Sequence, residues 1–200
     1  MLVPLEFCFY ISHMIKSTAF LVLFLYHFHF CFGQDAGSDN NLSSFFKLDI
    51  GGQGIGVTYE PRLSNKMTAD ISAGVGGGYE IAEGSIEINY GRPTLYFSFT
   101  PKFFYNRRSR IEKGKKTLFN AGNYFGLRIK YVGTNNSPVS SYNNGILANI
   151  HWGIQRPMGK HWTFSSHFGA GYAQDIDYDF GTIYPAVDFK FSYVFLNSKK

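Results

Sequence analysis

Apolar side chains recur at every second position over long stretches of this chain, and this spacing limits its fold more than any other feature. Between Met67 and Tyr79 the odd positions are mainly apolar, whereas the even positions are small, polar or charged. Successive side chains point to opposite faces in an extended strand, so the pattern predicts strands with one apolar and one polar face. It argues against a helical fold, in which neighbours on one face lie three or four residues apart.

The same alternation returns along most of the chain and predicts an all-β protein. The expected strands cover residues 43–51, 54–60, 67–80, 94–106, 117–132, 145–156, 161–173 and 182–196. Across the segment from Gly51 to Gly54 the apolar positions change from even to odd numbers, which indicates either a tight hairpin or a glycine bulge. The hairpin gives eight strands, and we favour it because bacterial single-chain barrels have even strand numbers.

The bulk of the apolar face indicates which side of the sheet faces outward. This face carries aromatic residues near its ends (Tyr105, Tyr131, Trp162, Tyr172 and Tyr193), whereas the polar face is rich in Gly, Ser, Asn and ionisable residues. Outer-membrane barrels expose large apolar side chains and aromatic girdles to lipid, whereas soluble barrels bury theirs. The sequence therefore predicts an antiparallel up-and-down transmembrane β-barrel. A soluble periplasmic lipocalin-like binding barrel is the alternative.

The first 33 residues have a different character from the rest of the chain. From Met14 onward a basic start is followed by an apolar run over residues 19–32 and then by a small glycine, which is the order of a secretory signal. A retained membrane anchor is the alternative, but this run is short for a bilayer span of roughly 20 residues. We expect residues 1–33 to be a cleaved signal peptide, with Met14 as an alternative start.

A short polar lead-in at residues 34–43 and a barrel domain at residues 44–200 are expected to follow the signal peptide. Cys8 and Cys31 are the two cysteines of the chain, and both lie in the expected signal peptide. The mature chain would therefore contain neither a disulfide nor a cysteine metal site.

Four segments of the expected hairpins stand out, at residues 101–106 (PKFFYN), 122–131, 152–162 and 189–195. Together with the export segment, they resemble a small Gram-negative outer-membrane β-barrel protein of the eight-stranded type. The resemblance is architectural. It implies location in the cell outer membrane, contact with outer-membrane lipid, and insertion by the outer-membrane assembly machinery. Such proteins usually end on an aromatic residue, whereas here Phe195 is followed by Leu-Asn-Ser-Lys-Lys.

The charged residues of the polar face are expected to fill the barrel. An eight-stranded barrel is only wide enough for its own side chains, and buried charges must pair. We expect an interior polar network that plugs the barrel and does not conduct ions. Its expected members are Asp70, Glu80, Lys102, Arg128, Lys130, His151, His167, Asp188 and Lys190.

His151 and His167 are weak candidates for metal ligands. A turn near Met158 and Gly159 would place both imidazoles on the inward face of adjacent strands. No third ligand is fixed by this pairing, so the sequence favours ordinary packing, and we expect no metal and no cofactor.

Catalytic residue types are present, but their spacing does not assemble a site. Ser165, Ser166, His161 and His167 offer a nucleophile and a base, as in outer-membrane lipid-modifying enzymes. Ser166 and His167 would point to opposite faces, and no acid is fixed beside Ser165 and His167. We expect no catalysis, with a structural or surface-interaction role and an unidentified surface or periplasmic partner. A ligand-binding or lipid-modifying barrel enzyme is the alternative.

Two polar links could contact partners. Residues 107–116 contain six bases and one acid but no interleaved aromatics, so they indicate a solvated turn or contact with anionic lipid phosphates, and not nucleic-acid binding. Residues 133–144 are rich in Asn and Ser and are expected to form an outer loop.

Overall fold

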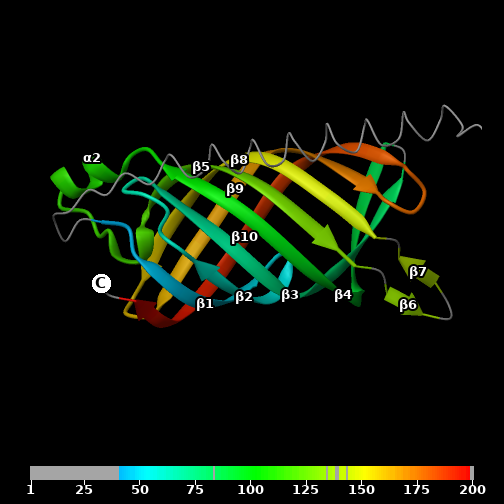
Figure 1. Cartoon of the computed structure of the whole chain (residues 1–200), viewed down its shortest axis with the longest axis horizontal. Coiled ribbons are helices and arrows are strands. Elements are labelled where there is room, and N and C mark those ends of the chain that lie inside the picture. Colours follow the sequence, from blue (N-terminus) through cyan, green and yellow to red (C-terminus); the bar gives the residue numbers. More distant parts are fainter. Residues whose placement is uncertain (1–40, 83, 134, 138–139, 143, 199–200) are drawn as a thin grey trace, which may run out of the picture. The chain divides into compact units, whose positions relative to one another are not determined.

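The computed structural model describes residues 41–82, 84–133, 135–137, 140–142 and 144–198. The expected signal peptide and most of the expected lead-in lie outside these residues. Within them the chain forms an eight-stranded antiparallel closed barrel, with strand order β1-β10-β9-β8-β5-β4-β3-β2 (Figure 1). The all-β prediction and the strand number are confirmed.

The barrel strands follow one another around the wall, and β1 closes the barrel by pairing with β10. They are β1 (Ser44–Gly51), β2 (Gly54–Glu60), β3 (Met67–Ala82), β4 (Ser85–Phe104), β5 (Gly122–Val132), β8 (Gly145–Met158), β9 (Trp162–Asp175) and β10 (Gly181–Ser198). Gly51 pairs with Gly54 where β1 turns into β2, so this segment is the hairpin and not a bulge within one strand. Gly54 has a φ of 117°, a backbone conformation that favours glycine.

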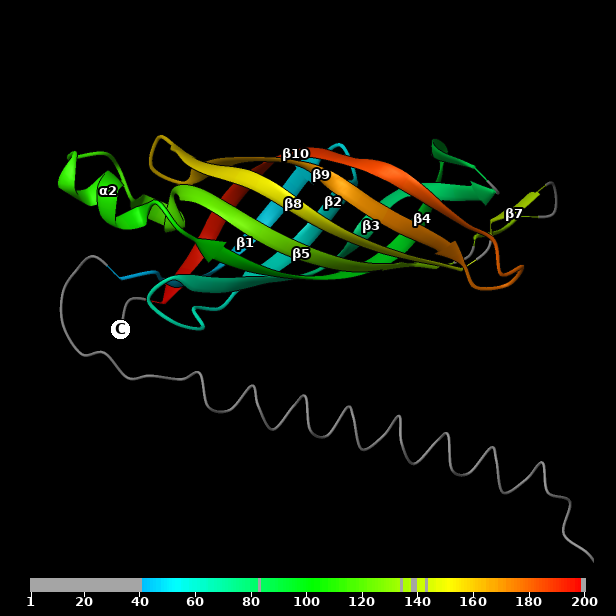
Figure 2. The same ribbon diagram turned by 90° about the horizontal axis from the view of Figure 1, so that it is seen from above.

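The two ends of the barrel differ in their connections. The link between β4 and β5 contains the short helix α2 (Arg107–Glu112) and the 3-10 turn η2 (Leu118–Asn120), at the same end as the end of β10 (Figure 2). The link between β5 and β8 contains a small two-stranded sheet of β6 (Asn135–Ser137) and β7 (Ser140–Tyr142) at the other end. No helix in the described residues is long and apolar enough to cross a membrane.

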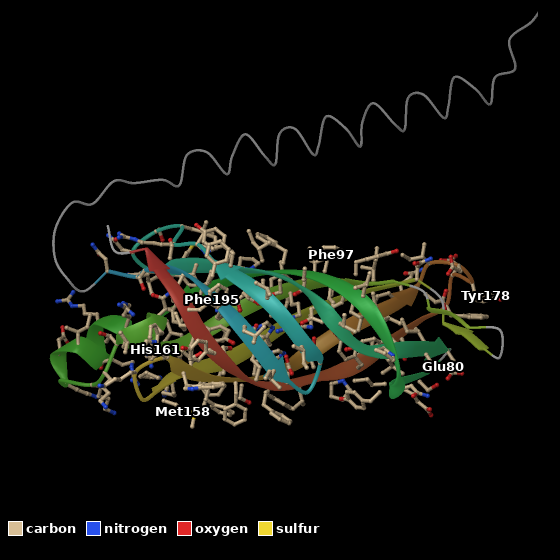
Figure 3. All side chains as sticks on the ribbon, turned by 90° about the horizontal axis from the view of Figure 1, so that it is seen from below. Glu80, Phe97, Met158, His161, Tyr178 and Phe195 are labelled. Atoms are coloured by element: carbon tan, nitrogen blue, oxygen red, sulfur yellow. The ribbon has the colours of Figure 1, made fainter. Side chains whose placement is uncertain are left out.

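Side chains alternate between the outside and the interior along the strands, as the sequence predicts. In β5 every even position from Tyr124 to Val132 is buried, while Phe125, Leu127, Ile129 and Tyr131 are exposed. Figure 3 shows Phe97, Met158 and Phe195 projecting from the outer surface. The large apolar side chains thus lie mainly outside, and the interior contains most of the ionised groups.

A bulge in the β3–β4 hairpin reverses this alternation. Gly77 pairs with Pro93, but Gly78 pairs with Asn89, so residues 90–92 of β4 have no partner in β3. Beyond the bulge Tyr79 is buried and Glu80 is exposed, at the end of the barrel that also carries Tyr178 (Figure 3). The expectation that Glu80 faces the interior is therefore wrong, because three consecutive glycines allow the strand to change faces.

Two expected links are also more ordered than the sequence suggested. The segment 81–93, which lies between the expected strands 67–80 and 94–106, mostly continues β3 and β4, and Ala82 pairs with Ser85 at their turn. The segment 107–116 contains α2, in which Arg108 pairs with Glu112 at 2.9 Å. Arg107 is buried and donates to the carbonyl oxygen of Asn41, and burial lowers the pKa of its guanidinium.

Candidate functional site

A compact cluster of lysines and carboxylates fills the part of the interior nearest the α2 end. We call it the ionic cluster, and its members are Lys47, Asp49, Glu60, Asp70, Lys102 and Lys190. Asp70 lies at its centre, where its two oxygens accept from Lys47 at 3.1 Å, Lys102 at 2.7 Å and Lys190 at 3.2 Å. Each lysine has a second carboxylate partner, which is Glu60 for Lys47 and Lys102 and Asp49 for Lys190.

Neutral polar groups complete the hydrogen bonds of the ionic cluster. The hydroxyl of Thr58 donates to Asp49 at 2.7 Å, and that of Thr68 donates to Glu60 at 3.1 Å. Asn120 donates to Glu60 from η2, and Gln155 accepts from Lys102 at 3.0 Å. Because three cations meet three anions within a hydrogen-bonded shell, the charges compensate one another in this part of the interior.

Two apolar clusters lie at the same end of the barrel. One contains Phe45, Phe119 and Val194, and the other contains Leu42, Phe104 and Tyr124. The ring of Phe119 is 5.8 Å from that of Phe45. Together with the ionic cluster, these side chains fill much of the interior at this end of the barrel.

Further along the interior, two cations have different surroundings. Arg128 is paired with Asp188 at 3.2 Å. Lys130 donates to two neutral acceptors, Gln53 Oε1 at 2.9 Å and the Tyr79 hydroxyl at 3.1 Å, and it forms no ion pair among the described residues. Its ammonium also lies 4.8 Å from the ring centroid of Tyr79 and 4.6 Å from that of Tyr96.

The two histidines stack on each other inside the barrel. His151 pairs with Gly169, and His167 pairs with Gly153, so the rings are diagonal neighbours with centroids 4.1 Å apart. Stacked rings point their nitrogen lone pairs away from a common centre, and His151 Nδ1 already lies 2.7 Å from Asn149 Oδ1. Among the described residues, no group of three or more His, Cys, Asp or Glu side chains could hold a metal ion.

The serine and histidine residues considered for catalysis do not assemble into a triad. Ser166 donates to the backbone carbonyl of Asp188 at 3.1 Å, and His161 is exposed near Tyr193. The buried hydroxyl of Ser165 has no hydrogen-bond partner in the described structure, so no base is placed to activate it.

A cavity of about 250 Å³ lies beyond the ionic cluster. The polar side chains of its lining include Gln53, Arg128, Lys130, Asn149 and His167. Most of its remaining lining is apolar or aromatic and comes from β3, β4, β8 and β10. Two buried cations, Arg128 and Lys130, thus face open space in this cavity.

The structure brings most of the expected interior residues together. Asp70, Lys102, Arg128, Lys130, His151, His167 and Asp188 are buried, and Lys190 is largely buried, whereas Glu80 is on the outside. Sequence reasoning missed Lys47, Asp49 and Glu60. The same alternation could have identified them, because they occupy the polar positions between the outward residues of β1 and β2. Gln155, also missed, lies on the polar face of β8.

No match to this chain was found among protein-family models, curated proteins or solved structures.

Proposed function

We propose that this protein is an outer-membrane β-barrel with a structural or surface-interaction role and no catalytic activity. The observation that carries the proposal is the reversed polarity of the barrel. Ile150 and Phe168 are 69% and 67% exposed, while Lys47 and Glu60 are fully buried. Water would strongly disfavour such a surface, whereas a lipid bilayer stabilises it.

The aromatic residues support the same location. On β9, Trp162 and Tyr172 are both exposed and lie ten residues apart, which matches the roughly 9–11 residues of a tilted membrane strand. Trp162 packs edge-on against Tyr193 of β10, and Trp152 donates to the hydroxyl of Tyr105 at the same end. Rings with one apolar and one polar end are typical of membrane interfaces.

The pairing of β1 with β10 closes the barrel, so over most of the wall the strands pair their backbone groups with one another, as strands in lipid must. The soluble lipocalin-like alternative would need a large apolar exterior to be covered by another molecule. The enzyme alternative would need an activated nucleophile, and the Ser165 hydroxyl has no hydrogen-bond partner in the described structure while that of Ser166 donates to a backbone carbonyl.

The proposed location is tested by heat-modifiable gel migration and outer-membrane fractionation. We expect the unboiled protein to migrate differently from the boiled protein and to remain with the outer membrane after carbonate washing. A mature protein that is soluble without detergent and migrates identically in both states would contradict the proposal.

The absence of conduction is tested separately in planar bilayers. Because the ionic cluster and the apolar clusters fill one end of the interior, we expect no discrete conductance steps. Reproducible single-channel steps from folded protein would show that the interior opens, while leaving the membrane location untouched.

A further inference from the structure

The wall of the barrel has a gap on one side, which we call the side notch. It lies between residues 77–82 of β3 and residues 181–188 of β10, beyond the turn in which Gly52 donates to the carbonyl oxygen of Phe189. The pairing of β1 with β10 ends at Gly51 and Lys190, and that of β2 with β3 ends at Ile55 and Val75. Because β3 and β10 continue past the β1–β2 hairpin, no described strand fills the wall between them (Figures 1 and 3).

The 250 Å³ cavity extends from this notch into the interior. Its lining includes Gln53 at the hairpin tip, Ile88 of β4 on one side and Val187 of β10 on the other. Val187 and Ile88 are 62% and 43% exposed, whereas Lys130 in the same lining is 2% exposed. The cavity is thus lined by both exposed and buried side chains. Ile88 is exposed although it pairs with Tyr79 and shares its inward face, so the cavity opens sideways through the wall.

The charge inside this opening favours an anion. Apart from Lys130, the inward-facing cations Lys47, Lys102, Lys190 and Arg128 all pair with carboxylates. Lys130 has no carboxylate partner among the described residues, and its Nζ instead contacts an amide oxygen, a phenol and two aromatic rings. A buried ammonium gains most from a charged acceptor, because charge-assisted hydrogen bonds are about twice as strong as neutral ones.

The remaining lining favours an apolar chain attached to that anion. Ile86, Ile88, Leu147, Pro185 and Val187 surround the polar end of the cavity. The volume corresponds to about eight water molecules at the liquid's share of roughly 30 Å³ each. That space accommodates an anionic headgroup and the first methylenes of one chain, and the rest of the chain can leave through the side notch.

We propose that the side notch is a binding site for a single-chain amphiphile with an anionic headgroup. In the bound state an oxygen of the headgroup takes the place of Gln53 Oε1 at the Lys130 ammonium, and the chain passes between β3 and β10. The site rests on the proposed membrane location, because a notch in a lipid-facing wall admits such a ligand directly from the bilayer. A fatty carboxylate and a lipid phosphate share this chemistry.

Binding is measured with folded full-length protein in phosphatidylcholine vesicles, which have no net charge. The probes are dansyl-labelled undecanoic acid, the matched labelled alcohol, and unlabelled dodecyl phosphate as a competitor. We expect the acid to bind saturably, with one molecule per barrel. The alcohol should bind with an affinity at least about tenfold lower, because a hydrogen bond between charged groups is lost. Lauric acid is added as a second unlabelled competitor. The competitor that displaces the labelled acid at the lower concentration identifies the preferred headgroup, which is a phosphate if it is dodecyl phosphate and a carboxylate if it is lauric acid.

Two variants test the residues of the site. Lys130→Met removes the cation and should weaken binding of the acid by about tenfold or more, leaving the alcohol unaffected. Val187→Trp keeps Lys130 but narrows the opening, so it should weaken the binding of the acid and of the alcohol alike. Lys160→Met, in the exposed turn before β9, is the matched control and should bind like the unchanged protein.

Folding of each variant is checked first by heat-modifiable migration. If Lys130→Met does not fold, Val187→Trp and the comparison of acid with alcohol still test the site. The inference is overturned if the acid does not saturate, if the alcohol binds equally well, or if a folded Lys130→Met barrel binds the acid unchanged. A barrel that inserts into the vesicles but fails these tests refutes the binding site alone, whereas a protein that does not insert refutes the proposed function.

Discussion

Replacing Asp70 with asparagine should strongly destabilise the barrel. Asp70 is buried and accepts from three ammonium groups, those of Lys47, Lys102 and Lys190, at 3.1, 2.7 and 3.2 Å. Asparagine keeps the shape of the side chain and one acceptor oxygen but removes the negative charge. The ionic cluster then has three cations and two anions.

The magnitude follows from the geometry of these contacts. At about 3 Å and an effective dielectric constant near 20, each contact is worth roughly 5 kcal/mol of Coulomb energy. Each lysine keeps its second carboxylate, and interior groups relax, so the net loss is smaller than that sum. Removing one partner of a buried ion pair typically costs about 3–5 kcal/mol, and we expect a loss of unfolding free energy in that range.

The assay is equilibrium urea unfolding of the protein in phosphatidylcholine vesicles, followed by tryptophan fluorescence and gel migration. Glu112→Gln is the matched control, because it removes a carboxylate from the exposed Arg108–Glu112 pair outside the barrel. Exposed pairs contribute about 0–1 kcal/mol, so the control should unfold close to the unchanged protein.

A second variant separates charge imbalance from loss of shape. Asp70→Asn combined with Lys102→Met leaves two cations and two anions in the ionic cluster. The double variant should therefore lose less unfolding free energy than the two single variants lose together. The reasoning is refuted if Asp70→Asn unfolds like Glu112→Gln. That result would mean that water screens these charges and that the interior is not plugged.

Three further outcomes follow from the packing. Ile150 lies in the middle of β8 on the outer face, and Ile150→Arg should lower the unfolding free energy in vesicles by about 2–4 kcal/mol. Ile150→Leu is the control and should leave it unchanged. An arginine variant as stable as the unchanged protein would argue against a lipid-facing wall. Gly126→Ala should lower the unfolding free energy in urea by about 1–3 kcal/mol, because the added Cβ would lie 2.4 Å from His151 Nε2. Gly91→Ala is the control and should lower it little. Zinc or nickel should leave the urea midpoint unchanged, and a rise that disappears when His167 is replaced would contradict the stacked geometry.

The strands and their faces could be predicted from the sequence because they depend on local geometry. A period of two residues requires extended backbone, and the positions of the large side chains identify the outward face. The glycines of 51–54 and the change of parity across them indicated the hairpin that completes eight strands. The missed residues Lys47, Asp49 and Glu60 obey the same rule, so their inward position was also present in the sequence.

The details of the β3–β4 hairpin could not be predicted in this way. Three glycines from Gly76 to Gly78 permit either continued alternation or a bulge, and only the pairing with β4 selects the bulge. Because a bulge shifts every later side chain to the other face, Glu80 lies outside and Tyr79 lies inside.

The sequence by itself determined that the chain forms a barrel of eight alternating strands with its charges on one face and its large apolar residues on the other. Only the tertiary structure decided which charges meet, because closing the barrel brings Lys47, Lys102 and Lys190 from three separate strands onto Asp70. It also decided that Lys130 keeps neutral partners and that the wall is open beside it. The partners of Lys130 and the gap in the wall both depend on how far the β1–β2 hairpin extends relative to β3 and β10. The alternation of residues within a single strand does not specify this distance.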